Sequence, residues 1–108
     1  MGAVHKVNDE NFVAEVVRTD GPVVVDFGAD WCGPCVRMAP ILEELAAAVG
    51  DRAKVCRLDV DESRKTAAEF RVMSIPTLIF FLGGKEAGRV IGLNTKEALI
   101  SKLDALTS

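Results

Sequence analysis

Residues 23–35 read VVVDFGADWCGPC, and this stretch decides the fold. Its first five residues are apolar on both faces apart from one carboxylate, which is typical of a strand buried inside a parallel sheet. Its last four residues place Cys32 and Cys35 three positions apart, and Pro34 between them suits the first residue of a helix. We therefore predict a buried strand followed directly by a helix, with both cysteines at the junction.

The residues before this stretch predict one more strand and one more helix. Residues 4–7 form a short strand candidate. Residues 12–17 carry apolar side chains at helical spacing, and Asn8 and Asp9 are the expected caps of that helix. A glycine and a proline at residues 21–22 separate this helix from the buried strand.

The residues after the cysteines continue the alternation of helices and strands. Residues 34–49 carry a helical stripe of apolar side chains that ends at Gly50, and Pro40 is expected to kink this helix without dividing it. Residues 54–60 predict a second buried strand. Residues 61–70 predict a short helix that begins with acidic and capping side chains.

The last third of the chain predicts a hairpin and a final helix. Residues 77–82 and 88–91 are expected to be antiparallel strands joined at a Gly-Gly turn. Asn94, with Glu97 three positions later, is the expected cap of the last helix, whose apolar face comprises Leu99, Leu103 and Leu106. The complete order is βαβαβαββα, which indicates an α/β protein whose central mixed sheet carries helices on both faces.

Composition and charge set the broad class. The chain has 108 residues, 49% hydrophobic and 27% charged, and no linker divides it, so we predict a single domain over residues 1–108. Its net charge of −3, with both signs interspersed, disfavours nucleic acid as a partner. No apolar run approaches the roughly 20 residues needed to cross a membrane, and residues 1–10 lack the features of a signal peptide. We expect a cytoplasmic monomer that does not bind membranes.

The two cysteines at the strand–helix junction suit reversible redox chemistry. Cys32 falls just ahead of the predicted helix, where free backbone NH groups and the helix dipole favour a thiolate. Cys35 lies one turn inside the helix and is expected to be more shielded. Attack by Cys32 on a disulfide would form a mixed disulfide, and attack by Cys35 on that intermediate would release the reduced product.

Other uses of this cysteine pair are less well supported by the sequence. Zinc needs two further ligands, and only Cys56 and His5 remain, neither at a suitable spacing. Iron–sulfur ligation needs more cysteines, and a static disulfide closing so short a loop adds little stability. We expect no metal, and we expect Cys56 to be a buried inert thiol and His5 to face solvent.

Several motifs together resemble the thioredoxin family, in its bacterial single-domain form with a CGPC active site, over essentially the whole chain. The matching segments are VDF at 25–27, ADWCGPC at 29–35, Pro40, SIPT at 74–77 and the glycine pair at 83–84. The resemblance implies a thioredoxin fold and a protein-disulfide reductase without a bound cofactor. It further implies re-reduction by an NADPH- and FAD-dependent thioredoxin reductase. The implied substrates are disulfide proteins such as ribonucleotide reductase, peroxiredoxin and methionine sulfoxide reductase.

The resemblance also assigns roles around the cysteines. In this family the residue matching Pro76 is cis and faces the disulfide, and the backbone around Ile75 pairs with the bound substrate. The implied docking surface around Cys32 comprises Gly33, Pro34, Ile75, Pro76, Gly92 and Leu93. Trp31 is expected to shield the thiolate and contact substrate, with incidental packing as the alternative.

Asp26 has two interpretations that the sequence leaves open. It is either a buried carboxylate held by hydrogen bonds or paired with Arg57 from the neighbouring strand, or a proton acceptor for Cys35. Burial between apolar neighbours is expected to raise its pKa, and a charged arginine nearby is expected to restrain that increase.

Three departures from the family pattern affect partner preference and redox potential. Gly28 stands where most members have an aromatic residue, Arg57 replaces a common lysine, and Val36 replaces a frequent basic residue. Two rival functions also stay open. One is a disulfide oxidase or isomerase, although secretory enzymes of that kind often have histidine at the position of Pro34. The other is a protein-binding module in which redox chemistry is incidental.

Overall fold

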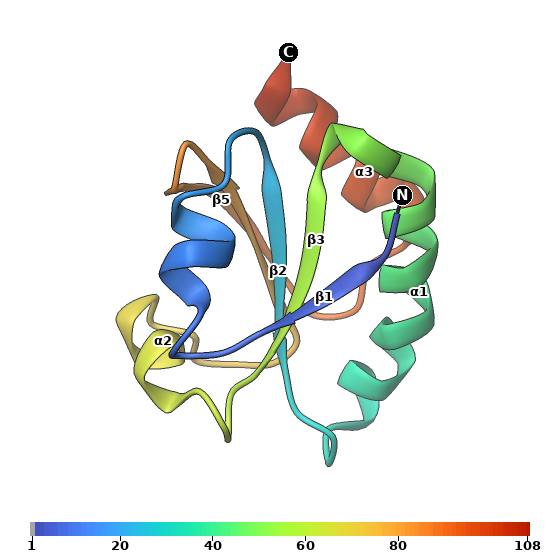
Figure 1. Cartoon of the computed structure of the whole chain (residues 1–108). Helices are drawn as coiled ribbons and strands as arrows, with labels where there is room; N and C mark the ends of the chain where they lie inside the picture. The colour runs from blue at the N-terminus through green and yellow to red at the C-terminus, as the bar shows by residue number, and fades with distance from the viewer. Residues whose placement is uncertain (1) are drawn as a thin grey trace.

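A five-stranded mixed sheet forms the centre of the protein in the computed structural model, which describes residues 2–108 (Figure 1). Met1, the first residue of the predicted domain, lies outside the described residues. The strands are β1 (Val4–Val7), β2 (Val23–Gly28), β3 (Lys54–Asp59), β4 (Thr77–Leu82) and β5 (Lys85–Ile91). The helical segments are the π-helical η1 (Val13–Val17), α1 (Gly33–Val49), the 3₁₀ turn η2 (Gly50–Arg52), α2 (Arg64–Glu69) and α3 (Lys96–Thr107). The predicted order of strands and helices is confirmed.

The strands lie in the order β1-β3-β2-β4-β5. β3 pairs in parallel with both β1 and β2, whereas β4 is antiparallel to β2 and to β5. All six residues of β2 are buried, because this strand lies in the middle of the sheet with both faces covered. The predicted mixed sheet is therefore confirmed.

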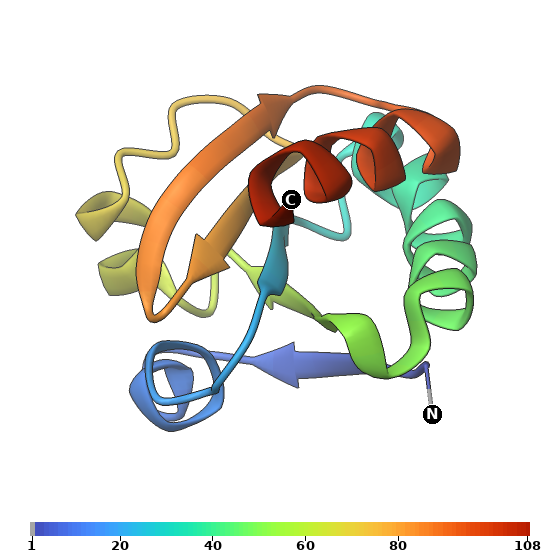
Figure 2. The ribbon, with the colours of Figure 1, turned by 90° about the horizontal axis from the view of Figure 1, so that it is seen from above.

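Helices cover both faces of the sheet. Figure 2 shows α1 and α3 on one side and η1 with α2 on the other. Val24 of β2 joins the core cluster that includes Leu42 and Leu103 of the two long helices. Val25 joins the opposite cluster, which contains the aromatic group Phe12, Phe27, Phe70 and Phe81. Because side chains alternate along a strand, Asp26 points to the face of α1.

α1 begins at the cysteine motif and runs as one helix past Pro40. Its first residue is Gly33, one position before the predicted start, and Cys32 is its N-cap. Gly50 ends the helix with a φ of 55°, a conformation that glycine adopts without steric cost. The predicted single helix over this segment is confirmed.

Three predicted details near element ends are wrong. The N-cap of α3 is Thr95, whose hydroxyl accepts from the NH of Ala98 at 3.1 Å, and not Asn94. Neither Asn8 nor Asp9 caps η1, whose N-cap is Phe12 and has no side-chain capping bond. The Asp9 carboxylate instead accepts from the NH and hydroxyl of Thr66 at 2.8 and 2.6 Å and so caps α2. β5 begins at Lys85, three residues before the prediction, because a tight two-residue turn lets pairing start there.

Candidate active site

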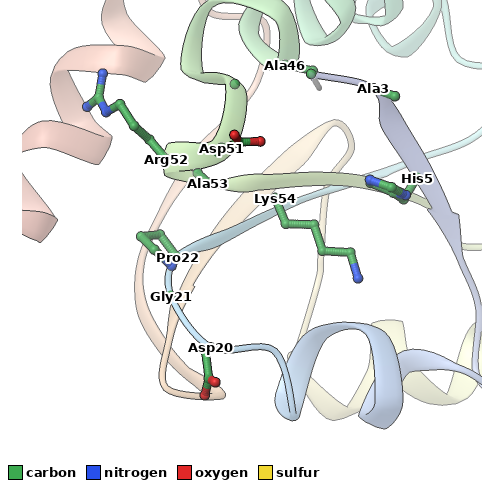
Figure 3. Close-up of a pocket in the computed structure, with 12 residues that line it drawn as sticks. Ala3, His5, Asp20, Gly21, Pro22, Ala46, Asp51, Arg52, Ala53 and Lys54 are labelled. Carbon is green, nitrogen blue, oxygen red and sulfur yellow. The ribbon is translucent and has the colours of Figure 1, made fainter.

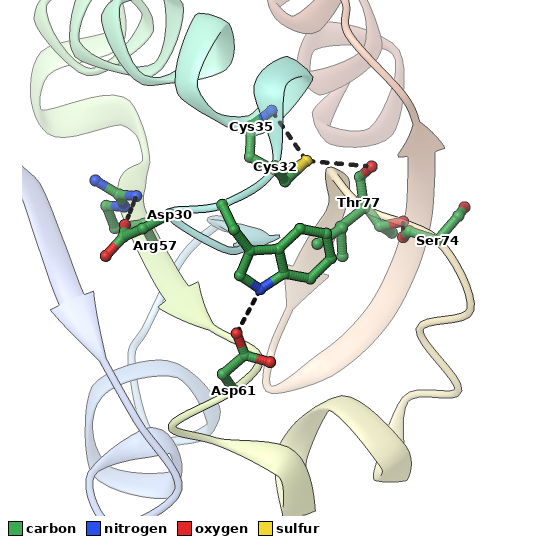
Figure 4. The surroundings of a disulfide bond; sticks show 9 residues. Asp30, Cys32, Cys35, Arg57, Asp61, Ser74 and Thr77 are labelled. Carbon is green, nitrogen blue, oxygen red and sulfur yellow. Dashed lines mark hydrogen bonds and ion pairs between the residues drawn. A yellow bond between two sulfur atoms is a disulfide. The ribbon is translucent and has the colours of Figure 1, made fainter.

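The cysteine pair occupies the N-terminal end of α1 (Figure 4). Cys32 and Cys35 form a disulfide with their Cα atoms 5.2 Å apart. The NH of Cys35 donates to Cys32 Sγ at 3.3 Å, so backbone dipoles at the helix start point at this sulfur. Cys32 is 6% exposed and Cys35 3%, whereas Gly33 and Pro34 between them are exposed. This arrangement favours a thiolate at Cys32 when the disulfide is reduced.

A second segment faces the cysteines from the other side. The carbonyl oxygen of Ile75 lies 3.8 Å from Cys32 Sγ, and the peptide bond between Ile75 and Pro76 is cis, as the family resemblance implied. The NH of Gly92 donates to the Pro76 carbonyl at 2.8 Å and brings the end of β5 to this segment. Ile75, Pro76 and Gly92 therefore gather beside Cys32, and Leu93 follows directly and is 44% exposed.

The loop from Phe70 to Pro76 is anchored at both ends. At its start, Arg89 Nη2 donates to the Phe70 carbonyl at 2.8 Å, and the Arg89 guanidinium is held by two contacts to the Glu86 carboxylate at 2.6 and 2.8 Å. Near its end, the Thr77 hydroxyl donates to the Ser74 carbonyl at 2.6 Å. These contacts hold the loop so that the Ile75 backbone faces Cys32.

Trp31 lies on the surface beside the cysteines. The residue is 72% exposed, and its Nε1–H donates to Asp61 Oδ2 at 2.6 Å (Figure 4). This hydrogen bond fixes the orientation of the exposed indole ring, which adds an apolar group to the surface around Cys32. Asp61 is a site residue that the sequence interpretation missed, because its partner is 30 positions away.

Asp26 lies behind the cysteines. It is 4% exposed, and among the described residues its Oδ1 has no hydrogen-bond partner. A methyl group placed on Gly28 would lie 3.2 Å from Cys35 Sγ and 3.8 Å from Asp26 Oδ1, so the thiol and the carboxylate border the same small space. Burial raises the pKa of Asp26 from 3.8 to about 6, and the positive charge of Arg57 partly offsets this increase.

Arg57 affects the pKa of Asp26 through its charge, without forming an ion pair with it. The two residues are register partners in the β2–β3 ladder, but the guanidinium makes its ion pair with Asp30, at 3.9 Å. The Arg57 side chain is 44% exposed, and water therefore screens its charge. The predicted restraint on the Asp26 pKa has the expected direction, whereas the predicted pairing gives way to the pairing with Asp30.

An exposed apolar surface surrounds the cysteine pair. Met73 is 92% exposed and lies two residues before Ile75. The sequence interpretation missed this residue, although an apolar side chain in a short loop before Pro76 was a usable signal. Half-buried Ile75 and Gly92 and buried Pro76 lie among the exposed residues of this surface. We call the following residues the active-site surface: Trp31, Gly33, Pro34, Val36, Met73, Ile75, Pro76, Gly92 and Leu93.

A cavity of about 250 Å³ lies at the opposite end of α1, around Ala46 and Gly50 (Figure 3). Neither Cys32 nor Cys35 lines it. Lys54, one of its cations, is already paired with Glu15 at 2.9 Å. The cavity is therefore separate from the cysteine chemistry.

The remaining candidate residues are placed as follows. Cys56 is fully buried in β3, and burial raises the pKa of its thiol to about 11, which keeps the thiol protonated. His5 is exposed, as expected. Within residues 2–108, no group of three or more His, Cys, Asp or Glu side chains is arranged to hold a metal ion. No helix in the described part of the chain is long and apolar enough to span a membrane.

Known proteins with similar sequences carry the name thioredoxin, in one case together with a reductase. The family profile named Thioredoxin matches residues 3–105. A thioredoxin of Alicyclobacillus acidocaldarius subsp. acidocaldarius is 48% identical over 101 residues, covering 94% of this chain and 95% of that protein. A thioredoxin of Staphylococcus haemolyticus (strain JCSC1435) is 49% identical over 102 residues, covering 94% and 96%. The bifunctional thioredoxin reductase/thioredoxin of Mycobacterium leprae (strain TN) is 45% identical over 102 residues, which are 94% of this chain but 22% of that longer protein.

Proposed function

Because the chain belongs to the thioredoxin family and is a thiol-disulfide oxidoreductase that reduces protein disulfides, we propose that Cys32 is its nucleophile, Cys35 its resolving thiol and Asp26 the proton acceptor. One observation carries the proposal. The disulfide lies at the start of α1, with the Ile75 backbone on one side and a buried carboxylate on the other.

The proposed reaction has two exchange steps. The Cys32 thiolate attacks a substrate disulfide, one substrate sulfur leaves as a thiolate, and a mixed disulfide forms. Cys35 then gives its proton to Asp26 and attacks Cys32 Sγ, which closes the Cys32–Cys35 disulfide and releases the second substrate sulfur. The shared space beside Gly28 and the raised pKa of Asp26 support proton transfer at this step, because a carboxylate with a pKa near 6 is a better base than an ordinary one.

The active-site surface supplies the proposed docking site for substrate chains. The backbone of Ile75, whose carbonyl faces Cys32 Sγ, would pair with an extended substrate segment. Trp31, Gly33, Pro34, Gly92 and Leu93 would contact its side chains. Arg57 completes the proposed set by tuning the charge near Asp26.

The proposed partners follow from family membership. We assign re-reduction to an NADPH- and FAD-dependent thioredoxin reductase, and the bifunctional Mycobacterium leprae relative carries both names on one chain. Proposed substrates are disulfide proteins such as ribonucleotide reductase, peroxiredoxin and methionine sulfoxide reductase. The protein is proposed to act in the cytoplasm as a monomeric single domain over residues 1–108, without a bound cofactor.

The cysteine roles are tested by trapping the mixed disulfide. With insulin as substrate, Cys35→Ser should accumulate a covalent complex through Cys32, because the second attack is lost. Cys32→Ser should form no complex and reduce no insulin. Cys56→Ser is the matched control and should reduce insulin at the wild-type rate, because Cys56 is buried away from the pair.

Two results would contradict these roles. A Cys32→Ser variant that still reduces insulin would reassign the nucleophile. A Cys32→Ser, Cys35→Ser double variant that keeps the biological role would instead indicate a binding module. Equilibration with a glutathione series separates reductase from isomerase, since a strongly reducing potential supports the former.

A further inference from the structure

We propose that Met73 is a peroxide-sensitive site, and that its oxidation to the sulfoxide weakens the reduction of protein substrates while leaving the cysteine pair intact. The inference rests on the proposed docking role of the active-site surface. It adds a modification site outside the dithiol.

The exposure of Met73 is the first observation. Met73 is 92% exposed, whereas Met38 of α1 is 0% exposed and belongs to a core cluster. Peroxide must reach the sulfur to oxidise it, so the exposed thioether reacts before the buried one. Among residues 2–108, Met73 is the methionine open to solvent.

The position of Met73 is the second observation. It lies two residues before Ile75, whose carbonyl is 3.8 Å from Cys32 Sγ. Two residues of extended chain span only about 7 Å. The loop is held by Arg89 at its start and by Gly92 at its end, so Met73 has a defined place at the rim. A polypeptide bound along Ile75 therefore reaches Met73 as well.

The chemistry at Met73 is an oxygen transfer. The thioether sulfur attacks one oxygen of hydrogen peroxide, the O–O bond breaks, and methionine sulfoxide and water form. The sulfur loses two electrons, and the peroxide gains them. The product replaces a flexible apolar group by a polar one, which must lose bound water when a substrate covers it. Substrate docking is therefore weakened without any change at the cysteines.

Within residues 2–108, the cysteine sulfur atoms are also protected when the protein is in its disulfide form. Cys32 and Cys35 are then bonded to each other and present no thiolate. Cys56 is buried, and its thiol has a pKa raised to about 11, so it is protonated at neutral pH. Among the sulfur atoms that the structure describes, peroxide treatment of the disulfide form therefore oxidises Met73 first.

The experiment compares one protein before and after peroxide. The disulfide form of the full chain is treated with hydrogen peroxide, the peroxide is removed, and oxidised methionines are located by peptide mass spectrometry. The protein is then reduced with dithiothreitol, which is removed, and mixed with insulin or with 5,5′-dithiobis(2-nitrobenzoate). Met73→Leu undergoes the same treatment and is compared with its own untreated sample.

The expected results separate docking from chemistry. Met73 gains oxygen before Met38, and the rate with insulin falls several-fold. The rate with the small disulfide stays unchanged, because that substrate does not need the surface. Met73→Leu keeps its own insulin rate after peroxide, and sulfoxide reductases for both epimers restore the wild-type rate.

Three results would overturn the proposal. They are an unchanged insulin rate at full Met73 oxidation, an equal loss in Met73→Leu, and oxidation of Met38 as fast as Met73. Failure of the proposed function gives a different result. The untreated protein would then not reduce insulin, while mass spectrometry would still show whether Met73 is oxidised before Met38.

Discussion

The charge of Asp26 works against the folded state. Burial raises its pKa from 3.8 to about 6, so between these pH values the folded protein binds a proton that the unfolded chain has lost. Stability from this residue is therefore fully present below about pH 4, falls as pH rises to about 6, and stays low above it. A base held in this way is useful to a thiol that must lose its proton nearby.

Asp26→Asn is predicted to stabilise the protein at neutral pH. The amide keeps the size of the carboxyl group and cannot ionise, so the unfavourable buried charge is removed. A shift from 3.8 to about 6 corresponds to about 3 kcal/mol in the free energy of unfolding at pH 7, and to little at pH 4. Urea unfolding at both pH values measures this difference.

The same variant separates the two interpretations of Asp26. If Asp26 is the proton acceptor, Asp26→Asn should slow resolution of the mixed disulfide more than its formation, as measured by stopped flow. Exposed Asp20 gives the matched control, and Asp20→Asn should change neither stability nor rates. Asp26→Asn with both rates unchanged would leave Asp26 a structural carboxylate only.

At the scale of elements, the sequence predicts those strands and helices that depend on neighbouring residues. The apolar run of β2 and the proline after Cys32 depend on neighbouring residues, so the strand, the helix and the dithiol at their junction were correctly placed. Contacts made across the fold were not predicted. Asp9 reaches α2 over 57 positions, and Arg57 turns from Asp26 to Asp30, because tertiary packing selects among equivalent polar partners.

Met73 and Thr95 illustrate the same limit. An apolar residue before Pro76 could belong to a core or to a surface, and only the path of the loop exposes it. Asn94 and Thr95 are both good caps, and the helix start decides between them by one residue.

Asp9→Ala is predicted to weaken α2 in particular. The Asp9 carboxylate accepts from the NH groups of Lys65 and Thr66 at 3.3 and 2.8 Å, at the start of a helix whose own N-cap, Ser63, makes no side-chain capping bond. Loss of these acceptors should lower the urea midpoint at pH 7 and speed amide exchange within α2 more than within α1.

The pH dependence of that loss provides a second check. Hydrogen bonds from Thr66 lower the pKa of Asp9, so its stabilisation is present above its ordinary value of 3.8 and is lost as pH falls through the lowered value. The difference between wild type and Asp9→Ala should therefore shrink in acid. Asp20→Ala is the control, and equal losses in both variants would remove the capping role.

At the scale of the whole molecule, one sheet joins two cores. Val24 of β2 packs toward α1 and α3, and Val25 packs toward η1 and α2. The active-site surface draws on elements of both faces, since Gly33 and Pro34 begin α1 and the Ile75 loop follows α2. Because β2 contributes to both clusters, a substitution that destabilises either cluster should destabilise the whole sheet and the dithiol at its edge.

The two cores are therefore predicted to unfold together, as the proposed single domain requires. Leu42→Ala on one face and Phe81→Ala on the other each remove a side chain that is 1% exposed, and should cost about 2–5 and 3–5 kcal/mol. Far-ultraviolet circular dichroism and Trp31 fluorescence should give coincident urea transitions with an unchanged slope for both variants. Val13→Ala, at a half-exposed position, is the control and should stay within about 0.5 kcal/mol of wild type. Non-coincident transitions of the two probes in either variant would show that the protein does not unfold as one unit, because a two-state transition moves all probes together.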